Sequence, residues 1–166
     1  MATAHRMVQR RIVELGRANG SAEDGLVLSR ALAMTTYRSI EEFEGRFATP
    51  PTSMGGDHQF EVEEYLLAQG SKFCTRIQPD AFLCLSLSID THDIPPSSVG
   101  IPTDLISVDS DTLVPPWLMR ELEEGLAGPC RHHTIESLFG HDAFLKEVEA
   151  IGSLLIRILD RKEISS

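Results

Sequence analysis

The sequence has 166 residues, of which 42% are hydrophobic and 24% charged, the composition of a globular protein long enough to bury a core. Its formal net charge of −10 excludes the surface rich in lysine and arginine that nucleic-acid partners require. No segment approaches the roughly 20 apolar residues of a membrane span, and the N-terminal MATAHRMVQRR lacks the apolar stretch of a signal peptide, so we expect a soluble protein without membrane partners.

The first part of the chain has the apolar spacing of helices, with three or four residues between successive apolar positions. Two serines, Ser21 and Ser39, each precede an acidic residue by three positions, which resembles a capping box at a helix start. Prolines and glycines in TPPTSMGGDH predict a loop. The expected helices span residues 5–20, 21–38, 39–47, 60–76 and 79–93.

The pattern changes after Pro95 and Pro96. Short stretches with β-branched residues predict strands at 103–109 and from Cys130 onwards, and each is followed by an amphipathic helix, 115–126 and 142–162. Strands that alternate with helices predict a parallel sheet. Two strands cannot cover both faces and both edges of such a sheet, so we expect the last part of a larger α/β protein.

The cysteines are odd in number and lack the paired spacing of a metal site; they are Cys74, Cys84 and Cys130. Unpaired thiols are typical of a reducing compartment, where disulfides are rare. We therefore expect free thiols and a cytoplasmic location.

Two polar residues follow the two predicted strands. Asp111 lies just past the first strand and His141 just past the second, in LFGHD. Because the carboxyl ends of parallel strands meet at one edge of a sheet, these side chains can come into contact and form the acid and base of a hydrolase-like triad. The alternative is that both residues only cap the helices that follow them.

Four stretches resemble the homoserine O-acyltransferases of the α/β-hydrolase superfamily: GLVLSRALAMTTYRS with the following EEF, VEEYLLAQGSKFCTR, IPTDLISVDSDTLVPP and FGHDAFLKE. They cover nearly the whole chain in the family's order. The resemblance implies the C-terminal half of the fold. It places a helix of the hydrolase core at 1–20, a helical lid at 21–96 and the last two β-α units of the parallel sheet at 97–166.

The resemblance also implies roles for single residues. Asp111 and His141 match the acid and base of a Ser-Asp-His triad. Arg30 and Tyr37 match positions that line the acyl-acceptor pocket, and Asp142 matches the acid that holds the acceptor's amino group. An arginine suits the carboxylate of homoserine and a carboxylate suits its ammonium group. Read without the family, Arg30 is a solvated helix residue and Tyr37 a core aromatic.

The implied reaction passes an acetyl or succinyl group from acyl-coenzyme A to a serine and then to the hydroxyl of homoserine, a step of methionine biosynthesis. Acyl-coenzyme A is a co-substrate, and no bound cofactor is implied. The family makes a homodimer the expected assembly, and a separate N-terminal polypeptide that carries the serine is a further expected partner.

The segment PTSMGG around Ser53 is similar to the family's nucleophile motif. The prolines before Ser53 cannot form the strand that a nucleophile elbow requires, and the glycine two residues before the serine is absent. Ser53 also follows Arg30 and Tyr37, whereas the family's nucleophile precedes them. We therefore expect the nucleophile outside these 166 residues and no acyl transfer by the chain alone.

Two other functions compete with the acyltransferase. One is a non-catalytic helical interaction module derived from the same fold. The other is a metal site formed by His132, His133 and His141. Adjacent histidines on a strand point to opposite faces, so they do not readily share one ion, and we expect no metal.

Overall fold

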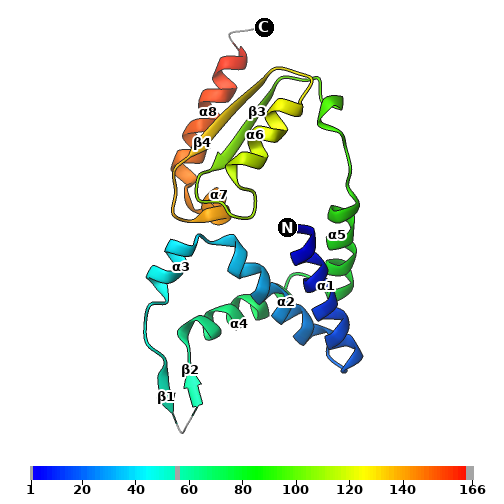
Figure 1. Ribbon diagram of the computed structural model, residues 1–166, viewed down its shortest axis with the longest axis vertical. Coiled ribbons are helices and arrows are strands. Elements are labelled where there is room, and N and C mark those ends of the chain that lie inside the picture. Colours follow the sequence, from blue (N-terminus) through cyan, green and yellow to red (C-terminus); the bar gives the residue numbers. More distant parts are fainter. Residues whose placement is uncertain (1, 55–56, 164–166) are drawn as a thin grey trace. The chain divides into compact units, whose positions relative to one another are not determined.

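The computed structural model describes residues 2–54 and 57–163, with side chains outside 53–59 and 161–163. The chain forms two compact units (Figure 1). The helical unit contains the residues up to Thr36 and Phe43–Asp93. The α/β unit contains Tyr37–Glu42 and the residues from Ile94 onwards.

The helical unit contains most of the helices predicted from the apolar spacing. They are α1 (Ala2–Ala18), α2 (Ala22–Tyr37), α3 (Ile40–Arg46), α4 (Glu61–Cys74) and α5 (Pro79–Thr91), with one end of α2 and of α3 in the α/β unit. Helix α1 ends before Gly20, whose φ of 92° favours glycine. The hydroxyl of Ser21 accepts a hydrogen bond from the backbone N–H of Asp24, which confirms the predicted cap.

Helices α1 and α5 are joined by ion pairs, and α1 and α2 each bury an apolar side chain. Asp90 accepts hydrogen bonds from Arg6 and Arg10, each at 2.6 Å. Val13 of α1 and Leu26 of α2 are fully buried. Amphipathic helices that bury one stripe in this way obtain most of their stability from tertiary packing.

The loop predicted over TPPTSMGGDH is wrong in part, because the chain forms a hairpin there. Strand β1 (Thr52–Met54) pairs antiparallel with β2 (Asp57–Gln59). Two consecutive glycines are a hairpin signal in a sequence. The nearby prolines favoured a loop instead, so the hairpin was not predicted.

The α/β unit contains the predicted parallel sheet. Strand β3 (Thr103–Val108) pairs in parallel with β4 (Cys130–Ile135) over six residues. The crossover between them contains α6 (Pro116–Gly125), with proline at its first position. The short helix η1 (Pro96–Ser98) precedes the sheet, and η2 (Gly140–Asp142) follows β4.

The single long helix predicted at the end of the chain is wrong in one respect. It is divided into α7 (Ala143–Lys146) and α8 (Val148–Glu163) at Glu147, whose φ of −87° and ψ of 51° are not helical. The carboxylate of Glu147 accepts a hydrogen bond from the hydroxyl of Ser137, 2.8 Å away. This contact with the loop after β4 accompanies the break, which the apolar periodicity does not reveal.

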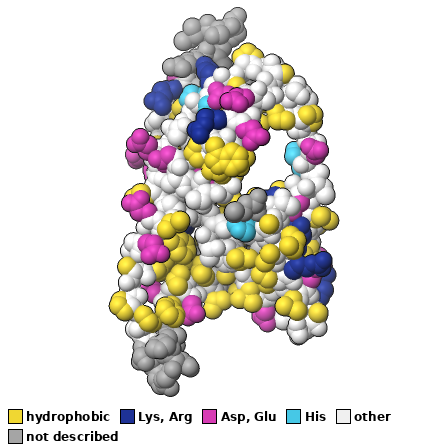
Figure 2. Space-filling view, viewed as in Figure 1, with side chains coloured by type: hydrophobic (Ala, Val, Ile, Leu, Met, Phe, Trp, Pro, Cys, Tyr) yellow, Lys and Arg dark blue, Asp and Glu magenta, His cyan; other side chains and the backbone are white. Residues whose placement is uncertain are grey.

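Large apolar side chains remain accessible on both units, and Figure 2 shows many hydrophobic atoms on the visible face. In the α/β unit they include Leu145, Val148 and Ile156, and in the helical unit Leu85 and Leu87. Apolar surface of this extent is typical of a region that contacts another polypeptide. Within the described residues, no helix has both the length and the apolar character needed to cross a bilayer.

Candidate active site

Asp111 lies in the turn that follows β3 and is buried. Its Oδ1 accepts hydrogen bonds from the backbone N–H groups of Leu113 at 2.8 Å and Val114 at 2.9 Å. These contacts stabilise the turn before α6, but the helix itself begins later, after Pro115. The side chain therefore has a local structural role through one oxygen, and its other oxygen remains for another partner.

That partner is His141. Its Nδ1 lies 2.7 Å from Oδ2 of Asp111, so Nδ1–H donates to the carboxylate. The Asp111 side chain is 2% exposed and the His141 side chain 35%, so the acid is shielded while the imidazole remains accessible. None of the described residues forms a hydrogen bond with Nε2 of His141. A buried acid that fixes the tautomer and leaves Nε2 free is the arrangement of a general base.

The contact shifts the pKa of both groups in opposite directions. Burial is the largest single effect on Asp111 and favours its neutral form, but the hydrogen bonds from His141, Val114 and Leu113 outweigh burial and hold the pKa of the carboxyl below its usual value. The hydrogen bond to Asp111 raises the pKa of His141, and burial of the ring opposes that shift. The negative charges of Asp111 and Asp142 raise it further.

Gly140 allows the loop of His141 to approach the segment between α2 and α3. Its φ of 57° lies in the left-handed region. A Cβ at this position would lie 2.8 Å from the backbone nitrogen of Ser39 and 3.0 Å from the carbonyl oxygen of Tyr37. Its N–H donates to the hydroxyl of Ser110, 3.1 Å away. The glycine of FGHD is therefore required by both conformation and space.

Two aromatic rings lie beside the imidazole of His141. The ring centroid of Tyr37 is 5.8 Å from that of His141, and the centroid of Phe144 is 5.9 Å away in an edge-to-face arrangement. Both contacts lie within the α/β unit, to which the end of α2 belongs. They restrict the orientation of the imidazole.

Arg38 is a site residue that the sequence analysis missed. Its Nε donates to Oδ2 of Asp142 at 2.7 Å, and its Nη1 donates to Oε1 of Glu42 at 2.7 Å. The Arg38 side chain is 7% exposed. Its place directly after Tyr37 in TTYRS does not separate it from a solvated arginine.

The predicted site residues fall into two groups. The structure brings Tyr37, Asp111, His141 and Asp142 together within the α/β unit. Arg30 belongs to the helical unit, where its guanidinium lies over the ring of Phe73, 4.9 Å from the centroid.

Ser53 does not have the surroundings of a nucleophile. Its backbone lies within β1, opposite His58, in an antiparallel hairpin, and not at a strand-to-helix turn. Its side chain lies outside the described residues. Ser110, close to the pair, donates its hydroxyl to the carbonyl oxygen of Ser137. The described residues thus provide an acid and a base, and none of them presents a hydroxyl to Nε2 of His141.

The histidines of β4 point to opposite faces of the sheet, as the alternation of a strand predicts. Nε2 of His132 lies 2.8 Å from the hydroxyl of Ser107, and its Nδ1 lies 3.3 Å from Glu123 of α6. Nε2 of His133 instead lies 2.9 Å from Oδ1 of Asp104. No group of three or more metal-ligating side chains converges within the described residues.

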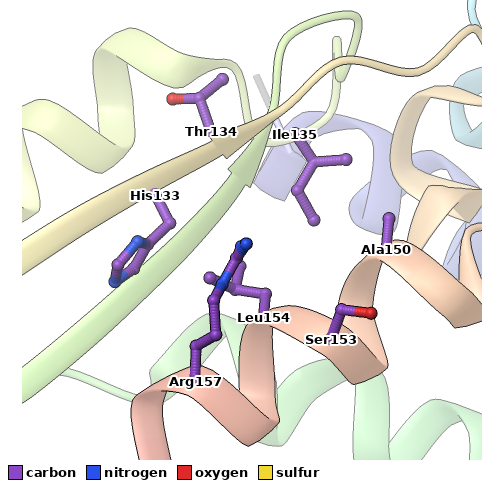
Figure 3. A pocket seen from close by; sticks show the side chains of 7 residues that line it. All are labelled: His133, Thr134, Ile135, Ala150, Ser153, Leu154 and Arg157. Carbon is purple, nitrogen blue, oxygen red and sulfur yellow. The ribbon is translucent and has the colours of Figure 1, made fainter. Parts of the chain in front are cut away.

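A separate cavity of about 420 Å³ lies between β4 and α8 (Figure 3). Its lining includes His133 and Ile135 of β4 and Leu154 of α8, and Arg157 extends from α8 towards the strand. Neither Asp111 nor His141 lines this cavity. The cavity is therefore distinct from the candidate active site.

The chain is similar to known acyltransferases. The chain is 42% identical over 158 residues to a homoserine O-succinyltransferase of Xanthomonas campestris pv. campestris, an alignment that covers 95% of this chain and 43% of the relative. It is 34% identical over 151 residues to a homoserine O-acetyltransferase of Mycolicibacterium smegmatis, covering 82% of this chain and 39% of that protein. Homoserine O-acyltransferase homologues cover most of this chain.

The chain spans about two fifths of the length of these acyltransferases. The resemblance noted in the sequence is confirmed, and the non-catalytic interaction module is not favoured. No family model matches the sequence.

Solved structures confirm the fold class. An esterase superimposes with a TM-score of 0.79 at 15% identity, covering 95% of this chain and 50% of the esterase. A homoserine O-acetyltransferase from Bacillus anthracis gives a TM-score of 0.75 at 12% identity, covering 89% of this chain and 46% of that chain. An α/β-hydrolase enzyme from a deep-sea metagenome gives 0.65 at 18% identity, covering 96% and 50%. The chain has a partial α/β-hydrolase fold.

Proposed function

We propose that this chain supplies the acid, the base and part of the acceptor site of a homoserine O-acyltransferase. The enzyme would transfer an acetyl or succinyl group from acyl-coenzyme A to the hydroxyl of homoserine, in cytoplasmic methionine biosynthesis. The observation that carries the proposal is the 2.7 Å contact between His141 and Asp111 at the carboxyl ends of neighbouring parallel strands. Its support is the similarity to homoserine O-acyltransferases over 95% of the chain.

In this proposal His141 acts twice through Nε2. It first takes the proton of a serine hydroxyl as the serine oxygen attacks the thioester carbonyl, and it returns the proton to the departing thiolate of coenzyme A. It then takes the proton of the homoserine hydroxyl, which attacks the acyl-serine, and returns this proton to the serine oxygen. Asp111 stabilises the imidazolium formed in each step and stays ionised. The serine would come from the part of the fold that completes the sheet.

The acceptor would be held by charge. Asp142, next to His141 in η2, would bind the ammonium group, and Tyr37 would line the acceptor pocket. Arg30 would bind the acceptor carboxylate through a charge-assisted hydrogen bond. The accessible apolar side chains of both units would contact the rest of the enzyme, including a second subunit in a homodimer.

The test is a chimera in which this chain replaces the matching segment of the Xanthomonas homoserine O-succinyltransferase. We expect the chimera to acylate homoserine, with His141→Ala reducing kcat by roughly 10³-fold or more. The matched control is His92→Ala, which changes an exposed histidine beyond α5 and should leave the rate unchanged. An active chimera that retains its rate after His141→Ala would contradict the assigned base.

A further inference from the structure

The Arg38 guanidinium joins two carboxylates next to the base. It binds Asp142 through Nε and Glu42 through Nη1, both at 2.7 Å. The side chains of Asp142 and Glu42 are 15% and 14% exposed. A planar guanidinium that donates through two different nitrogens fixes the orientation of both partners, which a single point charge does not.

The backbone around Arg38 is fixed by contacts of its own. The hydroxyl of Ser39 donates to the carbonyl oxygen of Leu138 and accepts the backbone N–H of Glu42. Gly140 approaches the same backbone so closely that no side chain would fit. The position of Arg38 relative to the loop of His141 is therefore determined by main-chain contacts. Its side chain then fixes the orientation of Asp142 through the hydrogen bond between them.

The ion pair between Arg38 and Asp142 is largely buried. Buried ion pairs are poor stabilisers, since the desolvation of the charges offsets much of their attraction. A largely buried carboxylate that a guanidinium holds in one orientation beside the base is instead suited to binding a cation, because a charge-assisted hydrogen bond depends on orientation.

We propose that Arg38, held by Glu42, is the positioning residue that aims Asp142 at the acceptor's ammonium group and thereby makes the enzyme select an acceptor with an amino group over one without. This inference rests on the proposed function. Arg38 touches neither the substrate nor the reacting atoms. Removal of Arg38 leaves Asp142 free to rotate, and removal of the Glu42 charge releases Arg38.

The experiment uses the same chimera and two acceptors, homoserine and 4-hydroxybutyrate, which is homoserine without its amino group. The measured quantity is the ratio of kcat/KM for homoserine to kcat/KM for 4-hydroxybutyrate. Arg38→Gln and Glu42→Gln should each lower this ratio roughly ten-fold or more, the effect of a lost hydrogen bond to a charged group. The loss should appear in KM for homoserine, with hydrolysis of acyl-coenzyme A in the absence of acceptor retained.

The matched control is Glu41→Gln, which makes the same charge change at the exposed neighbouring position and should leave the ratio unchanged. Arg38→Lys keeps the positive charge but loses the planar guanidinium with its two separate donors, so it should recover only part of the ratio. This variant also controls for misfolding of Arg38→Gln. An unchanged ratio, including one that results from equal losses for both acceptors, would overturn this inference and leave the proposed function intact. A parent chimera that does not acylate homoserine would overturn the proposed function, and the inference with it.

Discussion

Asp111 binds His141 with one carboxylate oxygen and the backbone of its own turn with the other. The orientation of the carboxylate thus does not depend on His141 alone, because the N–H groups of Leu113 and Val114 also fix its plane. A structural role and a role as the acid of a triad appear as alternatives in the sequence, and Asp111 uses one oxygen for the turn before α6 and the other for His141.

The first prediction concerns the charge state of His141. Asp111→Asn should lower the pKa of His141, since the hydrogen bond to Asp111 is the main cause of its raised value and the opposing effect of burial remains. NMR titration of the imidazole in the 166-residue chain measures the midpoint directly. Glu136→Gln, an exposed carboxylate of the same loop, is the control. An Asp111→Asn midpoint at or above that of the parent would refute the electrostatic account.

The second prediction is the pH dependence of the chimera. A base must be neutral to accept a proton, and the pKa of His141 is raised above its ordinary value of about 6.5. We therefore expect kcat/KM to increase with pH through a midpoint above 6.5. Stopped-flow or steady-state assays between pH 5 and 9 provide the profile. A midpoint below 6 would show that another group controls the rate.

The third prediction is a steric effect at Gly140. Gly140→Ala should destabilise the protein by about 1–3 kcal/mol, because the left-handed backbone is strained with a side chain and the new Cβ would lie 2.8 Å from the nitrogen of Ser39. Urea denaturation measures the change in the free energy of unfolding.

Gly152→Ala is the matched control within the same unit. This position lies in α8, and a Cβ there meets nothing within 4 Å. The substitution should stabilise the helix by about 0.5–1 kcal/mol. If the two alanines had the same effect, the close approach at Gly140 would not be significant.

The fourth prediction concerns acid stability. The pKa of Asp104 is lowered to about 2, mainly by hydrogen bonds from Arg131 and His133. A carboxyl whose folded pKa is depressed contributes stability above its unfolded pKa of about 4, and this contribution is lost as the pH falls towards 2. The difference in unfolding free energy between the parent and Asp104→Asn should thus be larger at pH 6 than at pH 2. Equal differences at both pH values would contradict this linkage.

The sequence predicts the elements whose signals are local. Apolar spacing locates α1 to α6, and the order of strands and helices indicates the parallel pairing of β3 with β4. The contact between Asp111 and His141 agrees with that pairing, because both residues lie in the segments that follow neighbouring strands. Local periodicity and topology were sufficient for these features.

Features that depend on distant contacts could not be predicted in this way. The break at Glu147 coincides with a hydrogen bond from Ser137, ten residues earlier. The pairing of Arg38 with Asp142 joins residues 104 positions apart. Nothing in the spacing of TTYRS distinguishes Arg38 from a solvated arginine, since the distinction lies in the packing of one segment against another.

The six residues from Tyr37 to Glu42 group with the α/β unit, although the helical segments on either side of them group elsewhere. A single crossover between two homologous acyltransferases, placed after Glu42 and before η2, would therefore take Arg38 from one parent and Asp142 from the other. The ion pair would be lost if the parents differed at these two positions. A helical region exchanged between parents should begin after Glu42 and end near Asp93. The boundary that keeps Arg38 with Asp142 lies inside α3, where no loop or proline marks it.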